Sequence, residues 1–235
     1  MIDELIVHGV RVPLRSGEVS PEIWAALQSG RYEANEARRI PQAVRPGDRV
    51  LELGAGIGVI TSIIASIESV RVWSFEADPS TALLAQRVID QNRRDNVILS
   101  NGILAAGPPE KVTFYRRADF WMSSKYPEQG PYEEKLQITS VDIDYFIQLH
   151  DINVVVMDVE GAELDILPRA ILPGIERVFL ELHDHLYGLA GVQAIAKAMS
   201  RKRLIYDPRG SSGPCVLYSL DDGERQFDAE IAHAL

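Results

Sequence analysis

A short apolar segment that runs straight into a glycine-rich turn constrains the fold of this chain more than any other feature. Residues 49–53 (Arg-Val-Leu-Glu-Leu) have the composition of a buried strand, and glycines follow at positions 54, 56 and 58. Alternate glycines let the backbone turn sharply and approach a ligand closely, and the helix that follows offers free N–H groups at its start. The segment therefore predicts a strand–turn–helix unit with a ligand at the turn, although such a turn can also be purely structural.

The spacing of the three glycines indicates which class of ligand the turn can bind. A dinucleotide fingerprint has the spacing Gly-x-Gly-x-x-Gly, and a phosphate-binding P-loop requires a Gly-Lys-Ser/Thr sequence. This turn reads Gly-x-Gly-x-Gly and has an acidic residue two positions before its first glycine. A carboxylate there suits a cationic ligand, and S-adenosylmethionine carries both a sulfonium and an amino group. The turn residues predicted to bind this cofactor are Glu52, Gly54, Ala55, Gly56 and Gly58.

Strands and helices alternate along the rest of the chain. Strands are expected at residues 49–53, 71–75, 97–99, 111–116, 153–157, 177–182, 204–206 and 215–220. Helices are expected at residues 59–69, 79–94, 141–149, 162–170 and 192–201, and a loop at 120–132. This alternation predicts an α/β fold with a mostly parallel sheet flanked by helices. Ligands of such sheets bind beyond the carboxyl ends of the strands, so functional residues are expected there.

Residues 1–45 lack this regular alternation. They contain helical segments at 21–30 and 34–40 and are too short for a core of their own. We therefore expect a short helical N-terminal cap or lid at residues 1–45, which could mediate a homodimer, and one cofactor-binding domain at residues 46–235.

Composition excludes several classes of function. The net charge of −10 disfavours nucleic acid and anionic membranes as partners. The single cysteine, Cys215, excludes an intrachain disulfide and a cysteine-based zinc site. Residues 1–4 do not begin a secretory signal, and no segment is long enough to span a membrane. These features predict a cytoplasmic protein.

Polar residues follow the predicted strands at the same edge of the sheet. Glu76 ends the second strand, where a carboxylate can accept hydrogen bonds from both hydroxyls of a ribose. Ala77 beside it, and Asn101 and Gly102 after the third strand, are predicted to complete the cofactor site. The loop at 120–126 combines aromatic, hydroxyl and lysine side chains, and suits a polar ring such as a sugar.

Two carboxylates and a histidine are the candidates for chemistry. Asp158 and Glu160 are two positions apart after an apolar strand, so their side chains should converge. The pair could hold the cofactor, act as a general base, bind a metal or simply favour the start of the next helix. His183 follows a neighbouring strand and could accept a proton. We expect His183, Glu160 and Asp158 to be catalytic, with Asp158 also at the cofactor, and no metal to be required.

Five segments together resemble the FkbM-type methyltransferase family. They are residues 50–58 (Val-Leu-Glu-Leu-Gly-Ala-Gly-Ile-Gly), 75–79 (Phe-Glu-Ala-Asp-Pro), 138–142 (Ile-Thr-Ser-Val-Asp), 157–163 (Met-Asp-Val-Glu-Gly-Ala-Glu) and 181–183 (Glu-Leu-His). The resemblance implies the class I methyltransferase (Rossmann-like) fold, S-adenosylmethionine as the methyl donor, and methylation of a hydroxyl group on a sugar or secondary metabolite. Methionine at position 157 departs from the family pattern, in which lysine is common.

Two other functions remain open at this point. A nucleotide-dependent oxidoreductase would share the fold but not the glycine spacing. A non-catalytic subunit that binds S-adenosylmethionine would keep the same motifs. The sequence does not identify the methyl acceptor, the oligomeric state, a role for a divalent metal or the general base.

Overall fold

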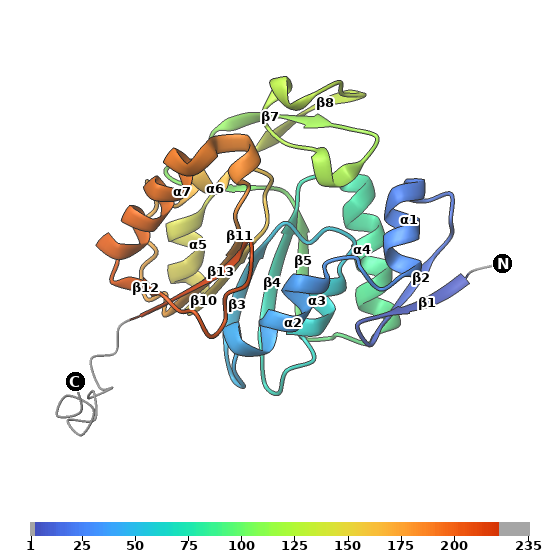
Figure 1. Ribbon diagram of the computed structural model, residues 1–235, viewed down its shortest axis with the longest axis horizontal. Helices are drawn as coiled ribbons and strands as arrows, with labels where there is room; N and C mark the ends of the chain where they lie inside the picture. The colour runs from blue at the N-terminus through green and yellow to red at the C-terminus, as the bar shows by residue number, and fades with distance from the viewer. Residues whose placement is uncertain (1–2, 221–235) are drawn as a thin grey trace.

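The computed structural model describes residues 3–220, and a seven-stranded sheet forms its centre (Figure 1). The strand order is β12-β13-β11-β10-β3-β4-β5. The strands are β3 (Arg49–Leu53), β4 (Arg71–Glu76), β5 (Val97–Asn101), β10 (Val154–Met157), β11 (Arg177–Glu181), β12 (Leu204–Tyr206) and β13 (Cys215–Leu220). The neighbouring strands of this sheet are parallel, except that β13 pairs antiparallel with both β11 and β12. The predicted α/β fold with a mostly parallel sheet is confirmed.

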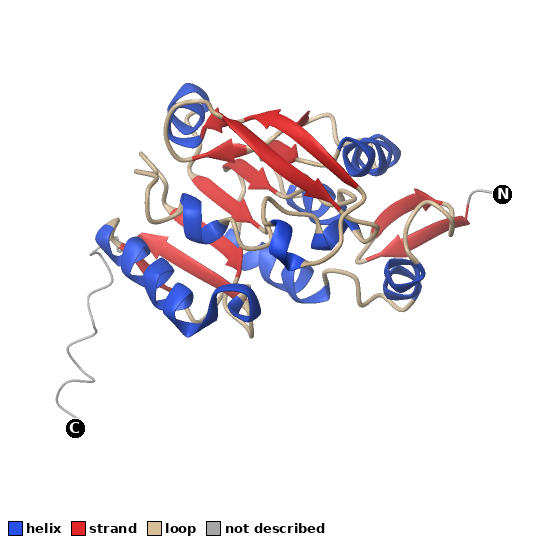
Figure 2. Ribbon diagram, turned by 90° about the horizontal axis from the view of Figure 1, so that it is seen from above, coloured by secondary structure: helices blue, strands red, loops and turns tan. Residues whose placement is uncertain are grey.

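Helices cover both faces of this sheet because its central strands are apolar on both sides. Successive residues of β3 point to opposite faces of the sheet. Val50 packs with one layer of helices and Leu51 with the other. The first layer contains α2 (Ala34–Ala43), α3 (Val59–Ile64) and α4 (Pro79–Gln91). The second contains α5 (Ile143–His150), α6 (Glu163–Ile166) and α7 (Asp184–Arg201). Figure 2 shows helices on both sides of the strands. None of the helices within residues 3–220 could cross a membrane, given their lengths and polarity.

The strand order reverses between β3 and β10. From β3 the chain proceeds to β4 and β5 on one side, whereas β10 is followed by β11 on the other. Connections leave in opposite directions at such a switch point, so a crevice opens at the carboxyl ends of the two strands. Val156 pairs with Glu52, and Met157 pairs with Leu53. This register places the glycine-rich turn beside Asp158.

The N-terminal segment contains a β-hairpin that the sequence did not lead us to expect. Strands β1 (Asp3–Val7) and β2 (Val10–Leu14) precede helix α1 (Pro21–Gln28). His8 and Gly9 both have positive φ, as a two-residue hairpin turn requires. The hairpin lies at the edge of the molecule in Figure 2, and β2 packs on α4 through a shared core. The purely helical cap was therefore wrong for residues 3–14, and the domain boundary at 45/46 stays a prediction.

A second hairpin stands above the carboxyl end of the sheet in Figure 1. Its strands are β7 (Lys111–Arg116) and β8 (Glu134–Thr139), joined by a segment with two 3₁₀ turns, η1 (Phe120–Met122) and η2 (Pro127–Gln129). We call residues 111–139 the arm. Short strands β6 (Leu104–Ala105) and β9 (Val141–Asp142) pair at its base. β8 was not predicted because it is largely exposed and its apolar side consists of only Leu136 and Ile138.

Several helix boundaries differ from those expected. α3 and α6 end earlier than the predicted helices at 59–69 and 162–170. α7 begins earlier than residue 192 and is interrupted at Gly188, whose φ is 62°. As a result His185 lies in the first turn of a helix. Residues 221–235 of the predicted cofactor domain lie outside the described residues.

Candidate active site

A cavity of about 640 Å³ opens at the carboxyl ends of β3, β4 and β10. This volume is within the range of small-molecule sites. Its walls come from the glycine turn, the segments after β4, β5 and β10, the N-terminal segment and the arm. Of the predicted cofactor residues, those that line it are Gly54, Gly56, Glu76, Ala77, Gly102 and Asp158.

The glycine turn is folded tightly against its neighbours. The N–H groups of Gly54 and Ala55 donate to the carbonyl oxygen of Phe75, and that of Gly56 donates to Glu76 Oε2 at 2.9 Å. Gly54 has a φ of +87°, and a Cβ there would lie 1.8 Å from the carbonyl oxygen of Asp158. Glycine at this position therefore permits both the turn and the close approach of two strand ends.

Glu76 lies at the centre of this arrangement. Its Oε1 accepts from the N–H of Asp78, so each carboxylate oxygen already accepts one hydrogen bond from a backbone N–H. Burial raises the pKa of Glu76 to about 7, against the lowering effect of these hydrogen bonds. Each carboxylate oxygen has a second lone pair, and the residue lines the cavity, so it can still accept from a ligand.

The other predicted cofactor residues lie behind the cavity wall. Glu52 is 1 % exposed, and its Oε2 accepts from the hydroxyls of Thr61 and Ser74. Gly58 begins α3 and packs against the backbone of Ala85, while Ala55 is buried within the turn. Asn101 is exposed, and its amide donates to the carbonyl oxygens of Glu76 and Ala77. These four residues shape the site from outside the main cavity.

The structure brings Asp158, Glu160 and His183 together. His183 Nε2 lies 3.4 Å from Asp158 Oδ1 and 3.4 Å from Glu160 Oε2. On the other side of the ring, Nδ1 lies 3.1 Å from Glu163 Oε1. Glu163 is fully buried and also accepts from the N–H of Val159. Three carboxylates therefore surround one buried imidazole, and two of them, Asp158 and Glu160, line the cavity, whereas His183 lies behind its wall.

These carboxylates determine the charge of His183. Burial alone would lower the pKa of this buried imidazole, but hydrogen bonds to Glu160 and Glu163 and the charges of Glu163 and Asp158 outweigh it and raise the pKa to about 11. The ring is therefore an imidazolium at neutral pH. A charged ring is a donor at both nitrogens and has no lone pair to accept a proton.

The same groups could hold a metal ion. Ligand atoms of Asp158, Glu160 and His183 all lie within 4.8 Å of one another, as do those of Glu36, Glu181 and Cys215. In the first group the imidazolium supplies one positive charge between the carboxylates of Asp158 and Glu160, which offsets part of their negative charge. His185 stands apart in α7, with its ring centre 5.8 Å from that of His183.

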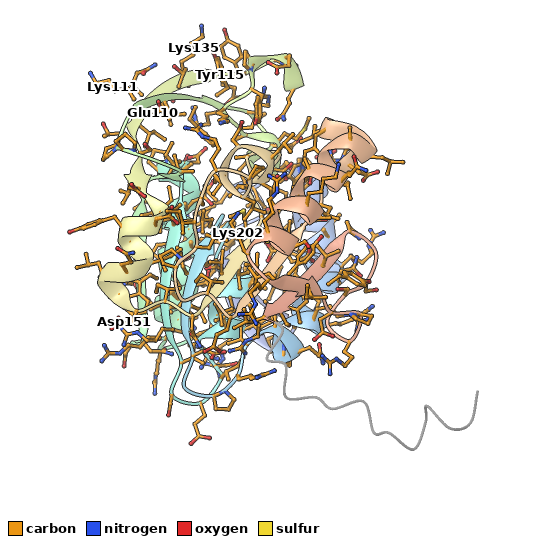
Figure 3. All side chains as sticks on the ribbon, turned by 90° about the vertical axis from the view of Figure 1, so that its left-hand side faces the viewer. Glu110, Lys111, Tyr115, Lys135, Asp151 and Lys202 are labelled. Carbon is orange, nitrogen blue, oxygen red and sulfur yellow. The ribbon has the colours of Figure 1, made fainter. Side chains whose placement is uncertain are left out.

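The arm closes the cavity opposite the sheet. Phe120, Trp121, Ser123, Ser124 and Lys125 line it. The loop keeps its shape because the buried Arg117 donates to four carbonyl oxygens, those of Tyr115, Met122, Tyr126 and Gly130. It is fixed to the sheet side by Asp165, which pairs with Lys125 and accepts from the Tyr126 hydroxyl. Figure 3 shows Tyr115 and Lys135 at the top of the molecule, on the arm's two strands.

The N-terminal segment supplies residues that the sequence did not single out. Tyr32, Glu33 and Glu36 line the cavity from the loop before α2 and its first turn. A Cβ on Gly56 would lie 3.1 Å from the Tyr32 hydroxyl and 3.3 Å from Glu33 Oε1, so both side chains reach the glycine turn. A signal was present in the closely spaced acids Glu33 and Glu36 before β3.

Comparison with known families decides the class of protein. The Methyltransferase FkbM domain model matches residues 52–202, which is more than half of the chain. The chain belongs to the FkbM methyltransferase family. This membership and the sheet order agree with the class I methyltransferase fold. No curated protein matches this chain.

Solved methyltransferases resemble this FkbM protein only distantly. The precorrin-6y C5,15-methyltransferase of Geobacter metallireducens is 10 % identical, with a TM-score of 0.48 over 74 % of this chain and 72 % of that one. The M. jannaschii TYW2 in complex with AdoMet is 12 % identical, with a TM-score of 0.47 over 90 % and 81 %. The Aeropyrum pernix fibrillarin with S-adenosyl-L-methionine is 14 % identical, with a TM-score of 0.45 over 76 % and 68 %.

The FkbM protein uses S-adenosylmethionine as its methyl donor. Its cavity suits this molecule chemically. Glu76 can accept from ribose hydroxyls. Asp158 and Glu160 after β10, and Glu181 at the end of β11, line the cavity and suit a cationic molecule. The expected cofactor is confirmed, whereas the role of each residue stays a prediction.

Proposed function

We propose that this FkbM methyltransferase transfers the methyl group to a hydroxyl of a small polar acceptor, a sugar or a secondary metabolite. The observation that carries the proposal is the pair Glu160 and Asp158, which contacts His183 and lines the donor cavity together with two aromatic and two serine residues of the arm. Aromatic faces and hydroxyls together suit a sugar-like ring.

When bound, S-adenosylmethionine supplies a methyl group attached to a positively charged sulfur, a good leaving group. The protein then has to align the acceptor oxygen with that carbon and to remove the hydroxyl proton as the oxygen attacks. Because His183 is already protonated, a carboxylate is the better acceptor for this proton. Glu160 lines the cavity and takes the proton, while His183 stays charged and holds Glu160 and Asp158 in place.

We propose a cytoplasmic enzyme, because its one cysteine is buried and unpaired and a reducing compartment suits a free thiol. A small-molecule acceptor is preferred to nucleic acid because of the net charge of −10 and the acidic cavity wall. Residues 31–36 act as part of a lid. The apolar sides of α1 and α2 are buried within this chain, so a homodimer would have to use other surfaces.

A screen of acceptors with methyl-labelled donor tests the proposed reaction. We expect label to appear on an alcohol oxygen of a sugar or hydroxylated metabolite. Label on nitrogen, carbon or RNA would contradict the choice of acceptor. Binding of the donor without transfer to any acceptor would favour a non-catalytic subunit.

Replacement of Glu76 tests the ribose contact. We expect Glu76→Ala to weaken binding of S-adenosylmethionine by roughly 2–3 kcal/mol, the scale of charge-assisted hydrogen bonds lost from a buried site. Isothermal calorimetry measures the change, with exposed Glu68→Ala as the matched control. Unchanged affinity in a folded Glu76→Ala protein would remove the ribose assignment.

Replacement of Trp121 tests the acceptor side of the cavity. We expect Trp121→Ala to raise the acceptor KM by roughly tenfold, about 1.4 kcal/mol, because it removes an aromatic wall, and to leave donor affinity unchanged. Tyr132→Ala is the control, since Tyr132 is on the same arm but packs against Tyr115 rather than lining the cavity. A change in donor affinity without one in acceptor KM would contradict the assignment.

A further inference from the structure

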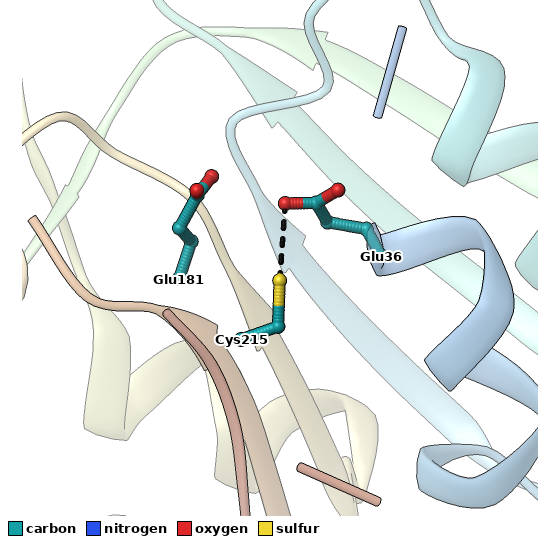
Figure 4. A group of neighbouring side chains, drawn as sticks. All are labelled: Glu36, Glu181 and Cys215. Atoms are coloured by element: carbon teal, nitrogen blue, oxygen red, sulfur yellow. Dashed lines mark hydrogen bonds between the residues drawn. The ribbon is translucent and has the colours of Figure 1, made fainter. Parts of the chain in front are cut away.

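Glu36, Glu181 and Cys215 form a cluster of metal-ligating side chains that the proposed methyl transfer does not use. Ligand atoms of the three residues all lie within 4.8 Å of one another. Figure 4 shows the three side chains converging, with Cys215 Sγ donating to Glu36 Oε1 at 3.3 Å. We call these three residues the thiol cluster.

The register of the sheet and one helix hold the thiol cluster together. Cys215 begins β13 and lies directly opposite Glu181, the last residue of β11, in their antiparallel pair. Residues directly opposite each other in such a pair present their side chains on the same face of the sheet. Glu36 reaches this pair from the first turn of α2, which packs on β11 and β13. Three packed elements therefore position the ligand atoms before any ion binds.

No basic side chain neutralises the thiol cluster. Among residues 3–220, no lysine or arginine forms an ion pair with Glu36 or Glu181. Burial and the charge of Glu36 raise the pKa of Glu181 to about 7, as expected where two carboxylates approach each other in a buried place. Cys215 is fully buried beside them. The cluster therefore offers one sulfur and two carboxylate ligands to a cation.

A buried acceptor beside the thiol cluster lacks a partner. A small cavity of about 20 Å³ is lined by Glu36, Glu181 and Glu52, which leaves room for one water molecule. Glu52 is 1 % exposed, and its Oε1 forms no hydrogen bond. A buried acceptor in this state costs free energy. A water molecule bound to an ion at Glu36 and Glu181 would supply the missing donor.

We propose that the thiol cluster binds one zinc ion, with a water molecule as its fourth ligand, and that the bound ion opposes the binding of S-adenosylmethionine. Zinc takes sulfur and oxygen ligands in tetrahedral sites, whereas magnesium and calcium take oxygen ligands. Bonds of about 2.0–2.3 Å place the ligand atoms of a tetrahedral zinc about 3.5 Å apart. The 3.3 Å contact between Cys215 and Glu36 already has this spacing.

The ligand set is a mixed one. A single cysteine excludes sites built from several cysteines, but it leaves open a site of one sulfur and two carboxylates. Binding is an exchange of a proton for the metal: the S–H bond of Cys215 breaks, its proton goes to the solvent, and the sulfur bonds to zinc. No oxidation or reduction is involved.

The position of the thiol cluster couples it to the methyl donor. Glu36 and Glu181 also line the large cavity, and S-adenosylmethionine carries a positively charged sulfur. A dication held in this wall repels a cation in the cavity, and such repulsion is strong where water is excluded. Donor and zinc then weaken each other's binding by the same factor. The coupling rests on the use of this donor, whereas the zinc site itself does not.

Binding of cobalt and zinc to tag-free, metal-free protein tests the site. Cobalt(II) bound to a thiolate absorbs in the near ultraviolet, so it reports the sulfur ligand directly. We expect this band in the wild type and not in Cys215→Ser. Loss of a residue that only supports a ligand weakens metal binding 10- to 100-fold, so loss of the ligand itself should weaken zinc by about 100-fold or more. Calorimetry measures the zinc affinity, and magnesium should not compete.

A second variant keeps the test decisive if Cys215→Ser unfolds. Glu36→Gln preserves the size of the side chain and removes its charge, and it should weaken zinc by about tenfold or more. Glu22→Gln is the matched control, because Glu22 has the same place in the first turn of α1 but is exposed. Thermal unfolding shows which variants are folded at the temperature of the assay.

Donor binding with and without zinc tests the coupling. We expect saturating zinc to weaken S-adenosylmethionine by roughly tenfold, within the usual range of coupling between two sites. The donor should weaken zinc by the same factor. In Cys215→Ser, zinc should have no effect on the donor, whose affinity without zinc should match that of the wild type. EDTA should restore donor affinity to zinc-treated protein and change nothing in metal-free protein.

Four results would count against the proposal. Wild-type protein that binds no zinc would overturn it. Zinc affinity unchanged in Cys215→Ser and Glu36→Gln would place the metal elsewhere, and loss of zinc in His183→Ala alone would place it at Asp158 and Glu160. Zinc that binds the thiol cluster but leaves donor affinity unchanged would refute the coupling. Protein that binds zinc but never S-adenosylmethionine would refute the coupling through the donor, and the cobalt band would still establish the zinc site.

Discussion

Replacing Glu160 by alanine should lower kcat by about 100-fold or more, the range typical of a lost general base. Glu160 lines the cavity, and its carboxylate is 3.4 Å from the charged ring of His183. Donor affinity should change little if the proton transfer alone is affected. Rapid-quench assays with labelled donor give kcat, and exposed Asp184→Asn serves as the matched control. A fully active Glu160→Ala enzyme would take this carboxylate out of the mechanism.

His183→Ala should lower turnover to a similar extent for a different reason. The substitution removes the positive charge that holds Asp158 and Glu160 close together. It leaves Glu163 buried without its imidazole partner, which adds a cost in stability. Thermal unfolding of the variant therefore accompanies the assay, and a folded, fully active His183→Ala protein would show that the imidazolium is dispensable.

A chelator tests whether the imidazolium or a metal ion is the cation of this cluster. If the imidazolium supplies the charge, EDTA should leave wild-type activity unchanged. Activity that is lost with EDTA and restored by magnesium would replace the imidazolium with a metal held by Asp158, Glu160 and His183, whose ligand atoms are close enough to share one.

Gly54→Ala is expected to destabilise the fold by about 2–5 kcal/mol, the sum of overpacking and a left-handed backbone with a side chain. The added Cβ would lie 1.8 Å from the carbonyl oxygen of Asp158, which is backbone and cannot rotate away. Chemical denaturation measures the loss. Gly102→Ala is the control, because it also lines the cavity but its Cβ would meet only Phe75 at 3.8 Å. Equal stability of the two variants would show that β3 and β10 separate easily at this edge.

Local sequence patterns were sufficient to predict the sheet and the residues on one side of the site. β10 and the middle of β11 are continuous apolar runs, and β3 and β4 are mostly apolar, so a parallel, doubly covered sheet is expected from them. The residues after these strands then meet at one edge for geometric reasons alone. This is why the turn at Gly54, Glu76 and the pair Asp158 and Glu160 could be placed before any coordinates.

The two hairpins were not predicted because their sequence patterns are weak. The N-terminal hairpin was missed because the helical segments at 21–30 and 34–40 led us to expect a helical cap, although His8 and Gly9 form the hairpin turn. β8 was missed because most of its side chains are exposed and its partner strand, β7, is separated from it by a long loop. Short exposed strands are stabilised by pairing rather than by an apolar periodicity.

The sequence by itself determined the class of fold, the donor and the edge of the sheet at which chemistry occurs, because glycine spacing and strand periodicity are properties of neighbouring residues. Only the tertiary structure decided the electrostatics. It placed Glu163 on one side of His183 and Asp158 and Glu160 on the other, which makes a candidate base into a cation. It also carried Glu33 from the N-terminal segment to the glycine turn. Both outcomes depend on charges that are distant in sequence and share one buried space, where burial and unlike neighbours set each pKa.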